Sequence, residues 1–151
     1  MRILKRLFAR STDASSKADT GVDTRRTDRQ RRGAEGERLA RAHLEAAGLV
    51  FVAANVRYRD GEIDLVMRDH GQNARALVFV EVRSRKSGAY GGAAASVTAA
   101  KQRRLIAAAE HYLAAHHARA APACRFDVVS IEGDDVATHR IVWLRDAFAV
   151  E

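Results

Sequence analysis

Three charged residues stand in apolar stretches of this sequence, where a charge needs a physical reason. Asp64 lies within GEIDLVMRD (61–69), and Glu81 and Arg83 lie within LVFVEVRSRK (77–86). Both stretches are rich in aliphatic and aromatic residues, as buried strands are. Burying a charge is costly unless the charge is paired or binds a metal. These positions are therefore the first candidates for a functional site.

The spacing of these residues predicts which of them share a face. Side chains alternate along a strand, so Glu81 and Arg83 point to the same side, opposite Val80 and Val82. By the same rule, Asp64 is expected to face away from the apolar side chains Ile63, Leu65 and Met67.

Pairing of the two stretches would bring the carboxylates together. If they form an antiparallel pair around a turn at 70–75, Asp64 and Glu81 become neighbours. Two adjacent carboxylates repel, and one takes a raised pKa unless a cation intervenes. Oxygen ligands suit Mg²⁺ or Mn²⁺, and Arg83 would lie beside such an ion. A metal ion, an activated water and a positive group are the components of metal-assisted phosphodiester hydrolysis.

The remaining segments predict the elements that position these residues. GAEGERLARAHLEAAG (33–48) has helical spacing, and a longer helix is expected over 98–117 with Thr98 as its N-cap. The expected strands are 49–58, 61–69, 76–85, 124–131 and 138–143. The first three should form a meander, and the long helix should cross over to a strand parallel to the third. This order predicts an α/β domain with a mixed central sheet flanked by helices.

The charge of the chain is concentrated at one end. Of the 151 residues, 1–32 hold ten Lys/Arg and four Asp, whereas 33–151 hold sixteen Lys/Arg and fifteen Asp/Glu. The first segment has too few apolar residues between 11 and 32 to offset its ordering entropy, so we expect a disordered basic tail over 1–32 and one folded domain over 33–151. The tail is expected to be a solvated leader rather than a binding arm.

The sequence also excludes some classes of protein. The lone Cys124 excludes an internal disulfide, which fits a reducing compartment. No apolar run approaches the length of a membrane span, and the N-terminus lacks a signal-peptide core. We expect a cytoplasmic protein without a membrane partner.

The quoted motifs resemble a known group of proteins. GEIDLVMRD followed by LVFVEVRSRK is similar to the D…(D/E)-x-K signature of restriction-endonuclease-like nucleases. GAEGERLA, Tyr90-Gly91-Gly92, Lys101-Gln102 and CRFDVV extend the likeness over residues 33–148. Together they resemble the YraN family of uncharacterised bacterial proteins, which is similar to archaeal Holliday-junction resolvases.

The resemblance implies a fold, an activity and residue roles. The fold would be restriction-endonuclease-like, and the activity a Mg²⁺- or Mn²⁺-dependent nuclease acting on DNA, with branched DNA as one candidate. A resolvase cuts two strands symmetrically, so analogy also implies a homodimer. Glu37, Asp64 and Glu81 match the metal ligands, and Gln102 falls where related nucleases carry a glutamine near the site.

Arg83 is where this sequence departs from the signature, which has lysine there. Arginine stays protonated and cannot act as a base, but it can clamp a phosphate with two hydrogen bonds. The catalytic set implied by the resemblance is thus Asp64, Glu81, Arg83 and Gln102. The departure keeps open a non-catalytic nucleic-acid-binding protein that retains the fold, and a protein-interaction adaptor is a further alternative.

Basic residues flank the proposed site in a domain that is otherwise nearly neutral. We predict that they form a cradle for a nucleic-acid backbone, with an aromatic residue in the loop between them, although Lys/Arg runs are commonly solvated helix faces. The predicted nucleic-acid-binding residues are Arg83, Arg85, Lys86, Tyr90, Lys101, Arg103 and Arg104.

The same residues also have explanations that involve the fold alone and no function. Asp64 and Glu81 could be a buried pair satisfied by Arg83 and backbone. Glu37 could be an acid favoured by the helix dipole. Glu62 is a metal ligand or a residue on the rim. Arg125 and Asp127 share a face of the fourth strand, where they pair with each other or reach the edge of the site.

Overall fold

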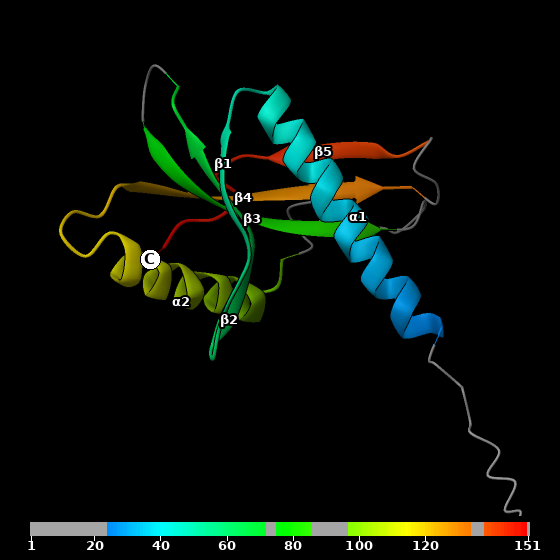
Figure 1. The fold of residues 1–151 in the computed structure, drawn as a ribbon, viewed down its shortest axis with the longest axis horizontal. Coiled ribbons are helices and arrows are strands. Elements are labelled where there is room, and N and C mark those ends of the chain that lie inside the picture. The colour runs from blue at the N-terminus through cyan, green and yellow to red at the C-terminus, as the bar shows by residue number, and fades with distance from the viewer. Residues whose placement is uncertain (1–23, 72–74, 86–96, 134–137, 151) are drawn as a thin grey trace, which may run out of the picture.

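The computed structural model describes residues 24–71, 75–85, 97–133 and 138–150. Its elements run from the blue N-terminal helix to the red C-terminal segment in Figure 1. They are α1 (Thr24–Ala46), β1 (Val50–Tyr58), β2 (Gly61–Asp69), β3 (Ala76–Arg85), α2 (Ala99–His116), β4 (Ala123–Glu132) and β5 (Arg140–Leu144).

The strands form one five-stranded sheet in the order β1-β2-β3-β4-β5. The β3–β4 pair is parallel, and the other neighbours are antiparallel. Parallel neighbours need a crossover, and α2 lies between β3 and β4 in the chain. The predicted meander, the crossover to a parallel strand and the mixed α/β architecture are therefore confirmed.

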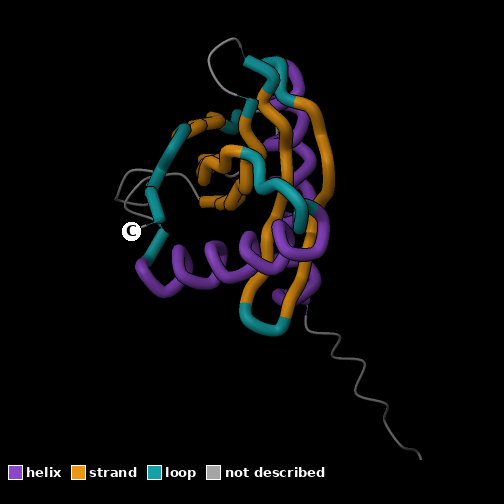
Figure 2. Tube along the Cα trace, turned by 90° about the vertical axis from the view of Figure 1, so that its left-hand side faces the viewer, coloured by secondary structure: helices purple, strands orange, loops and turns teal. Residues whose placement is uncertain are grey.

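The two helices pack on opposite faces of the sheet (Figure 2). On one face, Ala40 and Leu44 of α1 contact a cluster that includes Val80. On the other, Leu105 of α2 packs with Phe79 and its neighbours. Since Phe79 and Val80 are consecutive, β3 alternates between the two layers, as the sequence predicts. Glu81 then falls on the α2 side.

The alternation along β2 differs from the prediction. Leu65 and Met67 pack on the α1 side, but Ile63 packs on the α2 side. The prediction that these three residues share a face is therefore wrong. The change of side falls at Asp64, across from Asn55, whose φ is +52°. Asn55 belongs to the neighbouring β1, so both strands depart from regular geometry at this point, and simple period-two counting along β2 fails here.

Helix α1 begins at Thr24 rather than at the expected Gly33. Residues 24–32 of the predicted tail are thus helical, and residues 1–23 lie outside the described residues. The segment TRRTDRQRR has no apolar stripe to reveal a helix, but Arg and Gln are good helix formers. Once the packed part of α1 has formed, adding turns avoids the cost of nucleation.

Helix α2 starts where the sequence predicts. Thr98 has extended backbone, and its Oγ1 accepts a hydrogen bond from the Lys101 N–H at 3.3 Å, so the predicted N-cap is confirmed. Gly61, at the start of β2, lies so close to α2 that a Cβ there would overlap the Arg104 carbonyl oxygen. These contacts fix the first turns of α2 against the sheet.

Within the described residues, no helix is long and apolar enough to cross a membrane.

The buried Asp127 carboxylate joins the carboxyl-terminal strands. It is 0% exposed and accepts hydrogen bonds from Arg125 Nε and Nη2 at 2.8 and 3.0 Å, from Trp143 Nε1 at 2.9 Å and from Asp146 N at 3.0 Å. Arg125 also donates to Asp69 Oδ2 at 2.9 Å. Arg125 and Asp127 therefore pair with each other, and their role is to hold β2, β4 and β5 together.

We expect Asp127→Ala to lower the free energy of unfolding by about 3 kcal/mol or more, because it leaves Arg125 and Trp143 without their buried acceptor. Urea unfolding followed by circular dichroism measures this change. Glu45→Ala is the control, since it removes an exposed pair with Arg41 that contributes less than about 1 kcal/mol. Equal effects of the two substitutions would contradict the structural role of Asp127.

Candidate active site

Asp64 lies where β2 and β3 separate. The paired positions of these strands run from Asp69–Ala76 to Leu65–Val80 and stop there. Beyond that point, Asp64 Oδ2 accepts a hydrogen bond from the Val82 N–H at 2.8 Å. The carboxylate thus takes the place of a backbone acceptor at the point of separation. It is held by β3 as well as by its own strand.

The environment of the Asp64 carboxyl disfavours its ionised form. Burial is the main cause that raises its pKa, to about 7, and the nearby charges of Glu81 and Glu37 raise it further. The Val82 N–H and the Lys101 ammonium lower the pKa only in part. Among the described residues, no cation forms an ion pair with Asp64. Burial and the neighbouring acids therefore favour a protonated or cation-bound Asp64 carboxyl up to near neutral pH.

Glu81, by contrast, has two cations. It is 5% exposed, and its Oε1 forms an ion pair with Lys101 Nζ, while Arg83 Nη1 lies 3.7 Å from the same oxygen. Arg83 comes from β3, as predicted, and Lys101 comes from the first turn of α2, which Thr98 caps. Sequence reasoning assigned Lys101 only to phosphate binding and missed its contact with Glu81. Its position three residues after the N-cap, facing the sheet, is the signal that could have found it.

Glu37 and Asn55 form the edge of the site next to Asp64. Asn55 Nδ2 donates to Glu37 Oε2 at 2.8 Å, so the left-handed residue of β1 holds the helical acid. Glu37 stays near enough to Asp64 to raise its pKa. Glu37, from α1, and Glu81, from β3, are thus both close enough to Asp64 of β2 for their charges to raise its pKa.

Two other candidates point elsewhere. Gln102 Nε2 donates to the Val97 carbonyl oxygen at 3.1 Å, so this amide is used where the chain enters α2. Glu62 is exposed, and its carboxylate lies 3.8 Å from Arg57 Nε. This favours a residue on the rim of the site over a metal ligand. The contacts of the described residues do not bring Gln102 to the carboxylates.

The carboxylates fit a hydrated divalent ion better than a closed metal site. No group of three or more His, Cys, Asp or Glu side chains is placed to hold a metal within the described residues. The predicted three-acid set is therefore not a preformed metal site, and Glu81 is the acid whose charge raises the pKa of Asp64 most. Mg²⁺ commonly binds one or two carboxylates and keeps several waters, whereas structural Zn²⁺ needs four protein ligands. The donor set fits Mg²⁺ or Mn²⁺.

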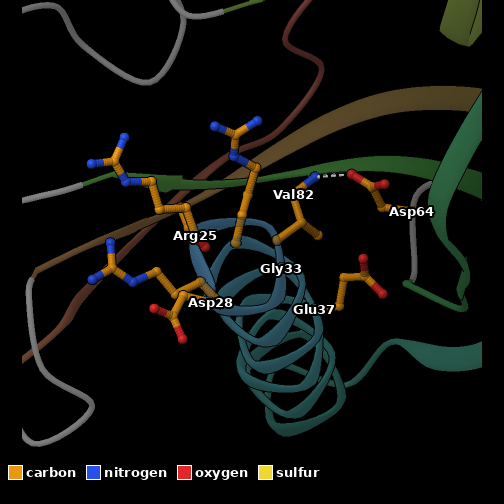
Figure 3. A pocket seen from close by; sticks show the side chains of 9 residues that line it. Arg25, Asp28, Gly33, Glu37, Asp64 and Val82 are labelled. Atoms are coloured by element: carbon orange, nitrogen blue, oxygen red, sulfur yellow. Dashed lines mark hydrogen bonds between the residues drawn. The ribbon is translucent and has the colours of Figure 1, made fainter. Parts of the chain in front are cut away.

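A pocket of about 550 Å³ opens beside Asp64 (Figure 3). Glu37 and Asp64 lie on one side of it, and Arg25 and Asp28 lie on the other. Its full lining is Arg25, Asp28, Arg29, Arg32, Gly33, Glu37, Asp64, Val82 and Ser84. Sequence reasoning assigned the first four to a solvated leader. The three arginines among them recur at intervals of four and three residues, which is helical spacing, and the sequence prediction did not use this signal.

The predicted basic cradle is divided in the structure. Arg83 and Lys101 lie together at Glu81. Arg103 comes two residues before the buried Leu105, so it projects from the solvent side of α2. The other members are the exposed Arg104, the half-buried Arg85 at the end of β3, and Lys86 and Tyr90, which lie outside the described residues.

The chain is similar to one family of bacterial proteins. Residues 36–131 match the model of a family described as "Uncharacterised protein family UPF0102". A UPF0102 protein of Xanthomonas campestris pv. campestris (strain B100) is 54% identical over 123 residues, which cover 82% of this chain and 95% of the relative. One from Burkholderia lata is 56% identical over 119 residues, or 79% and 77% of the two chains. One from Yersinia pseudotuberculosis is 55% identical over 117 residues, or 77% and 92%.

The pKa of Asp64 predicts how stability depends on pH in metal-free buffer with EDTA. The folded-state pKa of about 7 lies above the ordinary value of 3.8, so the folded protein keeps a proton that the unfolded chain releases. The stability associated with Asp64 is complete below pH 3.8 and is lost as the pH rises through 7. Relative to Asp64→Asn, the wild type should lose at most about 4 kcal/mol between pH 4 and pH 8.

Asp69→Asn is the control for this series. The Gly71 N–H and Arg125 hold the pKa of Asp69 below its usual range, so its contribution has the opposite sign: it is present above the ordinary pKa and is lost as the pH falls. Urea unfolding of the three proteins at pH 4, 6 and 8 measures both trends. A difference between wild type and Asp64→Asn that stays constant with pH would show that Asp64 has no raised pKa.

Proposed function

The chain belongs to the uncharacterised protein family UPF0102, and from the geometry of its acidic site we propose that it is a metal-dependent nuclease that hydrolyses phosphodiester bonds in DNA. Asp64 and Glu81 would hold Mg²⁺ or Mn²⁺, and Glu37 would act at the edge of the site. Branched DNA is a candidate substrate, and a homodimer would allow two strands to be cut.

One observation carries the proposal: the Asp64 carboxyl is mostly buried, lies beside other carboxylates and has no ion-pair partner among the described residues. A pair that served only the fold would be expected to be neutralised within the protein. Glu81 is neutralised in this way, but Asp64 is not. A divalent cation between the two carboxylates would remove their repulsion.

A bound Mg²⁺ or Mn²⁺ would polarise a phosphoryl oxygen and lower the pKa of a water molecule. The protein's own groups do the rest. The Val82 N–H fixes the orientation of Asp64, and the Asn55 amide fixes Glu37. Arg83 and Lys101 place two positive charges beside Glu81, where negative charge develops on a phosphate during hydrolysis.

Lys101 is relevant to the difference between this chain and the nuclease signature at position 83. The nuclease signature has lysine two residues after the acid, and this chain has Arg83 there. Lys101 brings a lysine to the same carboxylate from α2. Because this ammonium is ion-paired, its role in the proposal is to supply positive charge rather than to remove a proton. Replacement of the signature lysine therefore leaves the site with two cations.

We expect Asp64→Ala and Glu81→Ala each to reduce the rate of DNA cleavage at least about 100-fold, since each removes half of the metal-binding pair. The assay incubates the full chain with duplex, single-stranded, flap and four-way-junction DNA in Mg²⁺ or Mn²⁺. Glu62→Ala is the matched control, because it removes an exposed carboxylate from the same strand. Nucleic-acid binding without cleavage in either metal would instead support the non-catalytic binding protein, and absence of both would support the adaptor.

The role of Lys101 has its own test. We expect Lys101→Met to slow cleavage about 100-fold and Lys101→Arg to retain activity within about tenfold of wild type, because arginine keeps the positive charge. Single-turnover rates with saturating DNA measure the chemical step. If Lys101→Arg is as slow as Lys101→Met, a purely electrostatic role is wrong and a proton-transfer role takes its place.

A further inference from the structure

We infer that the N-terminal half of α1 is a phosphate-binding arm, formed by Arg25, Arg29 and Arg32, which holds the nucleic-acid strand as it leads to the carboxylates. This rests on the proposed function for its substrate class. It assigns a role to residues 24–32, which precede the stretch that matches the family model.

The arm and the carboxylates share one pocket. Arg25, Arg29 and Arg32 line it together with Glu37 and Asp64. In Figure 3 the carboxylates lie on one side and Arg25 on the other. In Figure 1 the blue end of α1 projects beyond the strands, so this part of the helix has little sheet to cover. A strand that enters the pocket along α1 would reach Asp64.

The three arginines point to one side of α1. Their spacing of four and then three residues places them on one helical face. All three are exposed, and none forms a hydrogen bond or ion pair with another described residue. Asp28 is the one acid between them in the sequence, so this face keeps an excess of positive charge.

This arrangement is unfavourable for the helix alone. Like charges four residues apart repel, and positive charges near the start of a helix oppose its dipole. The first turn of α1 contains no acid that would offset this. An anion bound along the arm would relieve both effects. The sequence therefore carries an electrostatic cost here that binding a negative partner would remove.

The extent of the arm fits a polymer rather than a single phosphate. Arg32 lies seven positions after Arg25, which is about 10 Å along the helix axis. One strand of B-DNA carries a charge every 3.4 Å or so, so the arm spans about three nucleotides. A membrane surface fits less well, because residues 24–32 include no apolar side chain to insert.

The test compares two double variants of the full chain. Arg29→Gln with Arg32→Gln removes two charges from the arm, and Arg26→Gln with Arg31→Gln removes two charges from the same helix segment outside the pocket lining. Glutamine is a good helix former, and circular dichroism checks that helix content is kept. Fluorescence anisotropy measures binding to a labelled single-stranded 20-mer and a duplex in EDTA, from 50 to 200 mM salt.

We expect the arm variant to weaken binding at least tenfold in low salt and to reduce the slope of log K against log salt by about 1.4 to 1.8, the value for two lost phosphate contacts. The control variant should change the slope by less than half as much. Equal losses in the two variants, no loss in the arm variant, or no binding by the wild type would each overturn the arm. Since binding is measured without metal, a protein that binds through the arm but never cleaves would refute the nuclease and leave the arm standing.

Discussion

The site depends on one hydrogen bond, from the Val82 N–H to the Asp64 carboxylate, at the point where β2 and β3 separate. A strand that loses its neighbour exposes backbone donors, and a buried donor must find an acceptor. Asp64 supplies that acceptor, and in doing so it is held beside Glu81 in a mostly buried position. The separation of the strands and the placement of the carboxylate are thus two consequences of the same contact.

The charges around the two carboxylates are unequal, and this inequality is what distinguishes a site from a structural pair. Glu81 is compensated by Lys101 and Arg83, whereas Asp64, which accepts a hydrogen bond from the Val82 N–H, forms no ion pair with another described residue and takes a pKa of about 7. Asp127 shows the opposite case in the same fold, since Arg125, Trp143 and Asp146 satisfy it completely. Asp127 therefore stabilises the sheet, whereas Asp64 keeps a repulsion that the proposed metal ion would offset.

The positive groups lie on two sides of the carboxylates. Lys101 and Arg83 approach Glu81 from the α2 side, and the arginines of α1 line the pocket that opens at Asp64. A polyanion that entered along the pocket would first approach the arginines of α1 and would then reach Lys101 and Arg83 beside Glu81. In the proposed nuclease, these cations would offset the repulsion between the acidic pair and the phosphate backbone.

The sequence by itself determined the α/β order, the mixed sheet and the shared face of Glu81 and Arg83, because these follow from local periodicity. It also determined the Thr98 cap, since capping depends on neighbours along the chain. Only the tertiary structure decided that Ile63 turns to the α2 side, that Lys101 meets Glu81, and that residues 24–32 extend α1 along a pocket. Each of these depends on contacts between segments far apart in sequence or on a break in regular geometry, as at Asn55, and period counting carries no information about either.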